Sequence, residues 1–326
     1  MKSLVRVSGA IAAVLVSSGA SAITITANSD ANSLASSLVS AANTGVIVTG
    51  ATLNGHNQVI NLADFGGSGT ATATSSGTYT NGSGTYGIGP GVVLSTGAVV
   101  AIDGYFEPVY GYSDGSNLLE GNTWAYGFSG IAATPDQELL LDPITANPDP
   151  SCQPTCNHFD VTELIINFDM QPGFDSVRFN IVFGSEEWPE FADSPFIDGF
   201  GMFLNGVNIA TVSGLPVNIQ HPATKPSIDQ FGIPTPGTEI PGTELDGILA
   251  PGGNPVLVFG GLVNPTGNTL RFIVADTTDP ILDTTVYFSA LEGVPEVPLP
   301  ASIWLLGTAA GGLLGRSFLK RRGARA

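Results

Sequence analysis

Basic residues are scarce in this chain, and most of them lie near its two ends. Only 10 of the 326 residues are Lys or Arg, against 28 Asp or Glu. Between residues 23 and 300 the chain has all of the acidic residues and only three basic ones (Arg178, Lys225 and Arg271), a formal charge of −25. Such a surface repels phosphate backbones, which argues against nucleic acid as a partner, and it attracts cations. The charge could also serve only to solvate the surface.

Sequence motifs of catalysis are few as well. The chain has no His-Glu-x-x-His zinc motif and no phosphate-binding Gly-x-x-x-x-Gly-Lys-Ser/Thr loop. Its three histidines, His56, His158 and His221, stand in unrelated loop contexts. We expect them to be at the surface or to have structural roles, and we predict that the protein is not an enzyme.

The first 22 residues have the pattern of a secretory signal peptide. Lys2 and Arg6 form the basic end, Val7 to Val16 the apolar segment, and the small residues Ala20 to Ala22 a cleavage site. The apolar segment is far shorter than the roughly 20 residues that a membrane span needs. We therefore predict export and a mature protein that begins near Ile23.

Cysteine is almost absent. Cys152 and Cys156 lie in a Pro-rich segment and are the chain's two cysteines. In an exported protein, two cysteines this close are expected to form a local disulfide. A metal site with His158 as third ligand is the alternative, although it lacks a second cysteine pair.

The region between the two ends predicts an all-β protein. The chain has 42 Gly and 23 Pro, which favours many turns. Val177, Phe179, Ile181 and Phe183 would lie on one face of a strand, as in a half-buried strand, and Asn205-Gly206 predicts a type I′ hairpin turn. Ser33 to Ala42 is the one good helix candidate. We predict an antiparallel, jelly-roll-like β-sandwich over residues 23–293 with one short N-terminal helix.

Other segments of this region are less regular. Residues 66–89 are rich in Gly, Ser and Thr, which favours a flexible loop, although an exposed hairpin is also compatible with them. Residues 221–253 are rich in Pro and Gly and are expected to form a loop.

Two acidic loops are the candidate functional site. The first follows the strand at 177–183, and the second lies between predicted strands at 270–275 and 284–291. Carboxylates on loops at strand ends are natural ligands for calcium, which takes six to eight oxygen atoms. The spacing does not match an EF-hand, so the prediction depends on clustering. The predicted calcium ligands are Glu186, Glu187, Asp198, Asp276, Asp279 and Asp283.

Two alternatives to calcium remain at this stage. Glu186 or Glu187 with Asp198 or Asp276 could form the carboxylate pair of a secreted, carbohydrate-active hydrolase. The acidic sandwich could also be a structural component that needs no specific ligand.

The C-terminal residues 294–326 predict a sorting tail. Val297, Pro298, Leu299 and Pro300 precede 15 uncharged residues and a basic end. This order resembles a PEP-CTERM sorting signal, with Leu299 where the motif usually has Glu. The resemblance implies a hydrophobic anchor helix in the inner membrane of a Gram-negative bacterium, followed by processing by an exosortase. An uncleaved C-terminal anchor is the alternative.

The two acidic loops also resemble a known family. Residues 183–191 (FGSEEWPEF), Asp198-Gly199-Phe200 and residues 275–283 (ADTTDPILD) are similar to the choice-of-anchor L domain of bacterial surface proteins. Trp188 replaces a more usual Tyr. The resemblance implies a protein of the cell surface or the exopolysaccharide matrix with an adhesive or structural role, and with exopolysaccharide or other surface proteins as partners.

Overall fold

The computed structural model describes residues 23–39, 45–61, 68–80, 86–100, 128, 130–145, 157–188, 191–226, 245 and 247–295. The predicted cleavage site, the cysteine pair, the sorting motif and the anchor helix lie outside these residues. Within the described part of the chain, no helix is long and apolar enough to cross a membrane.

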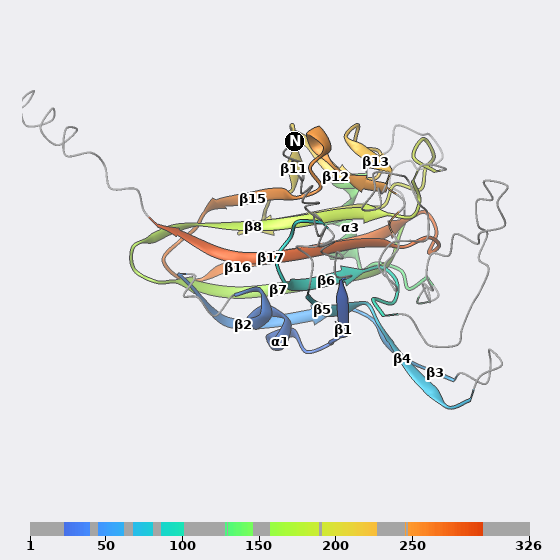
Figure 1. The fold of residues 1–326 in the computed structure, drawn as a ribbon, viewed down its shortest axis with the longest axis horizontal. Coiled ribbons are helices and arrows are strands. Elements are labelled where there is room, and N and C mark those ends of the chain that lie inside the picture. The colour runs from blue at the N-terminus through green and yellow to red at the C-terminus, as the bar shows by residue number, and fades with distance from the viewer. Residues whose placement is uncertain are drawn as a thin grey trace, which may run out of the picture.

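Two antiparallel sheets form the body of the structure (Figure 1). The first sheet has β8 near its centre, flanked by β17 on one side and by β14 and β15 on the other. Its strands are β1 (Thr24–Ala27), β5 (Ser76–Thr80), β6 (Gly91–Ser95), β8 (Phe174–Ser185), β13 (Thr224–Pro226), β14 (Gly247–Leu249), β15 (Leu257–Leu262) and β17 (Thr284–Pro295).

The second sheet has β16 between β9 and β7, with β2 at one edge. A hairpin of β3 (Asn57–Asn61) and β4 (Thr70–Thr74) extends away from the two sheets (Figure 1). The strands of the second sheet are β2 (Val46–Asn54), β7 (His158–Met170), β9 (Gly199–Leu204), β10 (Val207–Asn208), β11 (Thr211–Val212), β12 (Leu215–Asn218) and β16 (Asn268–Thr277).

The main hydrophobic core lies between the two sheets, which confirms the predicted antiparallel β-sandwich. Phe272 of β16 packs edge-on against Phe179 of β8, with ring centroids 6.1 Å apart, and tilted against Phe288 of β17 at 4.4 Å. All three side chains are buried. Aromatic pairs in this geometry add to the free energy gained by burying apolar area.

Strand β8 is buried more fully than its alternating pattern predicts. Phe179 and its alternate neighbours face the main core, as expected, but Val182 is also fully buried. Val182 packs in a second core with Tyr79 and Tyr287, on the other face of the first sheet. The prediction of a half-buried strand is therefore wrong at this end of β8, because another layer of residues covers the outer face.

The predicted N-terminal helix is present but shorter. Helix α1 spans Ala31–Leu38, where Ser33 to Ala42 was predicted. The Asp30 carboxylate caps its N-terminus by accepting a hydrogen bond from the Ser33 N–H (2.6 Å). The helix ends at Leu38 because Val39 has extended backbone angles.

A second helix was not predicted. Helix α3 spans Pro135–Thr145 and covers part of the outer face of the second sheet. Its Leu141 and Ile144 are buried with Val161 of β7 and Ile273 of β16. Packing against the sheet thus stabilises a segment that contains an internal proline, Pro143.

Three local predictions can be compared with the strands. The Asn205-Gly206 turn is confirmed, since both residues have positive φ (51° and 84°) as a type I′ turn requires. The loop predicted for residues 66–89 is wrong in part, because β4 and β5 lie within it. The loop predicted for residues 221–253 likewise contains β13 and β14.

We predict that Phe272→Ala destabilises the protein by about 3–5 kcal/mol, because it leaves a cavity between the two sheets. The matched control is Leu262→Ala, since Leu262 is 79% exposed and should change the free energy of unfolding by less than about 0.5 kcal/mol. Urea denaturation measures both. Equal effects of the two substitutions would contradict the placement of the core.

Candidate functional site

The predicted acidic residues gather at one end of the sandwich because the strands that carry them end there. Ser185 of β8 pairs with Thr284 of β17, and Ala275 of β16 pairs with Gly199 of β9. Glu186, Asp198 and Asp283 directly flank these strand ends. Asp276 lies within β16 rather than in a loop, which corrects the predicted start of the second acidic loop. We call Glu186, Asp198, Asp276 and Asp283 the acidic cluster.

Glu186 and Asp283 connect the two loops of the first sheet. The Asp283 N–H donates to Glu186 Oε2 (2.6 Å), and the Glu186 N–H donates to the Asp283 carbonyl oxygen (3.1 Å). Both side chains are buried. This reciprocal pair fixes the loop after β8 against the loop before β17.

Asp198 connects the two sheets. Its Oδ1 accepts from the Thr277 N–H (2.9 Å) of β16, and its Oδ2 accepts from the Thr284 hydroxyl (2.8 Å) of β17. The carboxylate is therefore fully positioned by donors from both layers of the sandwich.

Asp276 is the exception in the cluster. Its side chain is 1% exposed, and neither carboxylate oxygen has a hydrogen-bond partner among the described residues. The nearby Thr96 hydroxyl is 3.4 Å from Asp283 Oδ1 and also accepts the Thr284 N–H. A buried carboxylate without partners is costly unless it is protonated or bound to a cation.

The electrostatics of the cluster follow from burial among like charges. Burial raises the pKa of Asp276 well above its usual range, and the Asp198 and Asp283 carboxylates raise it further, although the nearby Thr96 hydroxyl lowers it. Burial likewise raises the pKa of Asp198. Burial and the Asp160 carboxylate raise the pKa of Asp283 to about 8.

The three basic residues between residues 23 and 300 do not compensate this charge. Arg178 pairs with Glu292 (2.7 Å), Arg271 pairs with Glu163 (3.1 Å), and Lys225 is exposed on β13. The acidic cluster therefore favours protons or bound cations.

The other two predicted ligands lie at the border of the cluster. Glu187 is buried, and its N–H donates to the Ser185 hydroxyl (3.1 Å). Asp279 is partly exposed and its Oδ1 accepts from the Ile281 N–H (3.1 Å), which fixes a turn. Asp279 is close enough to raise the pKa of Asp198.

Sequence reasoning missed the contribution of β6 to this site. Gly97 follows β6 and faces the Asp283 carboxylate so closely that a Cβ atom at position 97 would overlap Asp283 Oδ2. Glycine is therefore required for Asp283 to reach the cluster. No pattern in the sequence indicates that this segment lies beside Asp283, and only the fold brings the two together.

A different group of side chains has the closest arrangement of metal-ligand atoms. Among the described residues, Glu138, Asp142 and His158 each offer a ligand atom within 4.8 Å of the other two. His158 was expected in a loop, but it begins β7 and is fully buried. We expected the histidines to lie at the surface or to have structural roles. His158 and His221 (6% exposed) are both buried, so only the structural role fits these two.

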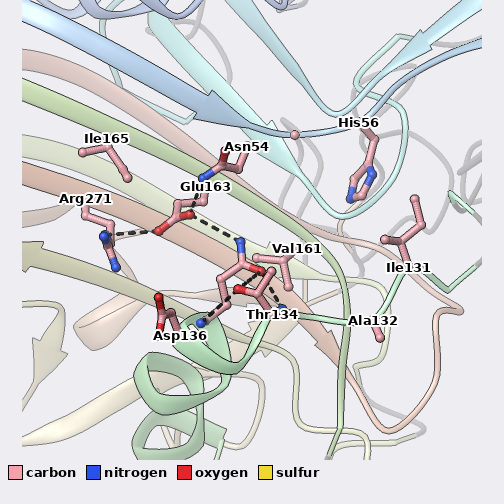
Figure 2. Close-up of a pocket in the computed structure, with 12 residues that line it drawn as sticks. Asn54, His56, Ile131, Ala132, Thr134, Asp136, Val161, Glu163, Ile165 and Arg271 are labelled. Carbon is pink, nitrogen blue, oxygen red and sulfur yellow. Dashed lines mark hydrogen bonds and ion pairs between the residues drawn. The ribbon is translucent and has the colours of Figure 1, made fainter.

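A polar cavity of about 520 Å³ lies between α3, β7 and the segment that follows β2. Figure 2 shows the Glu163 carboxylate held by three donors: Asn54 Nδ2 at 2.8 Å, Gln137 Nε2 at 3.3 Å and Arg271 Nε at 3.1 Å. His56 also lines the cavity, and burial lowers its pKa. The cavity is of a size that holds small ligands, and its lining can exchange hydrogen bonds with a polar one.

We predict that calcium-free protein loses stability as pH rises, because ionising a buried Asp283 is unfavourable. The folded-state pKa of about 8 lies above the unfolded value of about 3.9. The stability contributed by the protonated carboxyl is therefore fully present below about pH 4 and is lost as pH rises through about 8. Thermal melting in a chelator from pH 5 to pH 9 measures this loss.

The Asp283→Asn variant should show a flatter dependence of melting temperature on pH than the wild type. Asp193→Asn removes an exposed carboxylate from the loop between β8 and β9 and serves as the matched control. Parallel curves for the wild type and Asp283→Asn would contradict the assignment.

Comparison with known families gives one match. The profile of the choice-of-anchor L domain matches residues 26–292. Comparison with curated proteins and with solved structures found no match. The matched region contains nearly all of the sandwich and the whole acidic cluster, and the family is one of surface-associated proteins of a non-enzymatic kind. This chain therefore belongs to the choice-of-anchor L domain family.

Proposed function

We propose that this protein is exported to the cell surface or the exopolysaccharide matrix of a Gram-negative bacterium, where it has an adhesive or structural role. The observation that carries the proposal is the family match, which spans nearly all of the chain between its two predicted targeting segments. In this proposal the signal peptide directs export, the C-terminal segment anchors the chain transiently in the inner membrane, and an exosortase processes it there. The partners are exopolysaccharide or other surface proteins.

Replacing residues 297–300 with alanines should block processing if the tail is a sorting signal. We expect an intact C-terminus in the inner-membrane fraction, whereas the wild type is cleaved and recovered outside the cell. Pro295→Ala, just outside the motif, is the matched control. Mass spectrometry of the C-terminus with cell fractionation measures the outcome. Identical processing of wild type and variant would contradict the proposed sorting.

The acidic cluster is proposed to bind calcium and so to hold together the loops at one end of the sandwich. The support is the buried Asp276, whose carboxylate oxygens lack hydrogen-bond partners, beside Asp198 and Asp283. Hard oxygen ligands of this kind suit calcium, and backbone carbonyls and water can supply the rest of its six to eight ligands. Glu186, Glu187 and Asp279 are the neighbouring carboxylates that complete the predicted set.

The ligand atoms of the cluster are spread more widely than in a compact site. Among the described residues, the ligand atoms that do lie close together belong to Glu138, Asp142 and His158 instead. We therefore expect calcium to draw the loops that carry Asp198, Asp276 and Asp283 closer together as it binds. This ordering should appear as increased protection of the loop backbone in hydrogen exchange.

Asp276→Asn should abolish the stabilisation by calcium. Millimolar calcium is expected to raise the melting temperature of the wild type at pH 8 and to leave this variant unchanged. In a chelator at pH 8, Asp276→Asn should melt higher than the wild type because the variant has no buried carboxyl that must either take up a proton or stay charged on folding. The gain should be at least about 2–4 °C, the shift that 1 kcal/mol gives in a domain of this size.

Asp193→Asn makes the same change of charge at an exposed position in the loop between β8 and β9 and should respond to calcium as the wild type does. A wild-type protein whose melting temperature and calorimetric heat do not respond to calcium would refute the calcium site. The proposed surface role does not depend on this result, and the sorting experiment tests it separately.

We do not extend the proposal to hydrolysis. The carboxylates suggested for a glycosidase pair, Glu186, Glu187, Asp198 and Asp276, are all buried. A glycosidic bond would have to lie between such a pair, and their burial leaves a polysaccharide no access in this conformation.

A further inference from the structure

His158, Glu138 and Asp142 meet where helix α3 lies against the start of β7. Glu138 and Asp142 are four residues apart on α3, so their side chains extend from the same face of the helix. His158 is the first residue of β7 and is fully buried. Its Nδ1 is 2.5 Å from Glu138 Oε2, and ligand atoms of all three residues lie within 4.8 Å of one another.

The imidazole of His158 is oriented by contacts on its other side. Its Nε2 lies 2.7 Å from the Thr145 hydroxyl, which itself donates to the Leu141 carbonyl oxygen (3.3 Å). With the hydroxyl donating to Leu141, Nε2 is the donor to the hydroxyl, and Nδ1 lies beside the Glu138 carboxylate. Histidines that bind metals typically donate their other N–H in this way, which fixes the ring and its tautomer.

Glu138 is oriented as well. Its Oε1 accepts the backbone N–H of His158 (3.1 Å), which leaves Oε2 directed at the imidazole. The Glu138 side chain is 27% exposed, so the group can be reached from solvent. The side chains of His158 and Glu138 are thus held in place by hydrogen bonds that a bound ion would not need to break, apart from the contact between Nδ1 and Oε2.

Asp142 gives a second, independent indication of a ligand. Its Oδ1 is buried and has no hydrogen-bond partner among the described residues. Two carboxylates four residues apart on a helix repel one another, and an unpartnered buried oxygen is unfavourable. A cation between Asp142, Glu138 and His158 would remove both costs, whereas the ion pair of His158 with Glu138 leaves Asp142 Oδ1 unsatisfied.

We propose that Glu138, Asp142 and His158 bind a divalent transition-metal ion of the zinc class. One imidazole nitrogen and two carboxylates form a ligand set that zinc accepts, with bonds of about 2.0–2.2 Å and water in the fourth position. Calcium and magnesium prefer oxygen ligands, so an imidazole ligand makes the site unfavourable for them. Binding displaces the proton between Nδ1 and Oε2 into solvent, so metal uptake releases protons. The site shares no carboxylate with the acidic cluster and does not depend on the proposed calcium site, although His158 pairs with Thr277 of β16, next to Asp276.

Isothermal titration of the purified exported protein with Zn²⁺ alone tests the proposal. We expect one ion per chain for the wild type. Asp142→Asn should weaken binding by about 10–100-fold or more, given that even outer contacts of metal ligands have effects of this size. Because Asp142 Oδ1 makes no hydrogen bond, this variant should fold even where His158→Ala does not. Asp136→Asn changes an exposed carboxylate in the first turn of the same helix and should bind Zn²⁺ as the wild type does.

Co²⁺ in place of Zn²⁺ distinguishes this site from the chain's two cysteines. The proposal predicts visible absorption bands without a thiolate charge-transfer band, and their loss in Asp142→Asn. It is overturned if Zn²⁺ does not bind, if Asp142→Asn binds as tightly as the wild type, or if a thiolate band shows that cysteines hold the ion. Calcium-dependent melting should be unaffected by Asp142→Asn, so failure here is distinguishable from failure of the calcium site.

Discussion

The burial of carboxylates at one end of the sandwich is the constraint on which the rest of this structure depends. Asp198 accepts hydrogen bonds from strands of both sheets, and Glu186 and Asp283 fix two loops of the first sheet. The same contacts bring Asp276 into a place where its carboxylate has no partner. The cross-sheet contacts that fix this end therefore also create a concentration of negative charge that a proton or a cation must balance.

Much of the sandwich was predictable because its signals are local. Alternating apolar residues in β8 and the Asn205-Gly206 turn specify a strand and a hairpin whatever surrounds them. Helix α3 was not predictable in this way, since Pro143 weakens its local signal and its stability comes from packing on Val161 and Ile273. Strand β5 has the composition of a loop, and pairing with β1 and β6 overrides it.

The candidate site was likewise predictable only where its signals are local. The acidic loops were evident from the sequence, and the strand pairings place four of the six predicted residues together. Their role as ligands stays a prediction. Two features depend on contacts between distant segments and had no local signal: the approach of Gly97 to Asp283, and the meeting of His158 with Glu138 and Asp142. His158 was considered as a metal ligand only beside the cysteines, because α3 was not expected.

The central claim is that a cation balances the buried carboxylates of a surface-associated protein. A crystal structure of the purified protein grown with calcium, with an anomalous difference map, tests it most directly. The account predicts an anomalous peak at calcium-to-oxygen distances of about 2.3–2.6 Å from Asp276, with Asp198 or Asp283 among the other ligands. A map with no peak at Asp276, and carboxyl groups close enough to share protons, would contradict it.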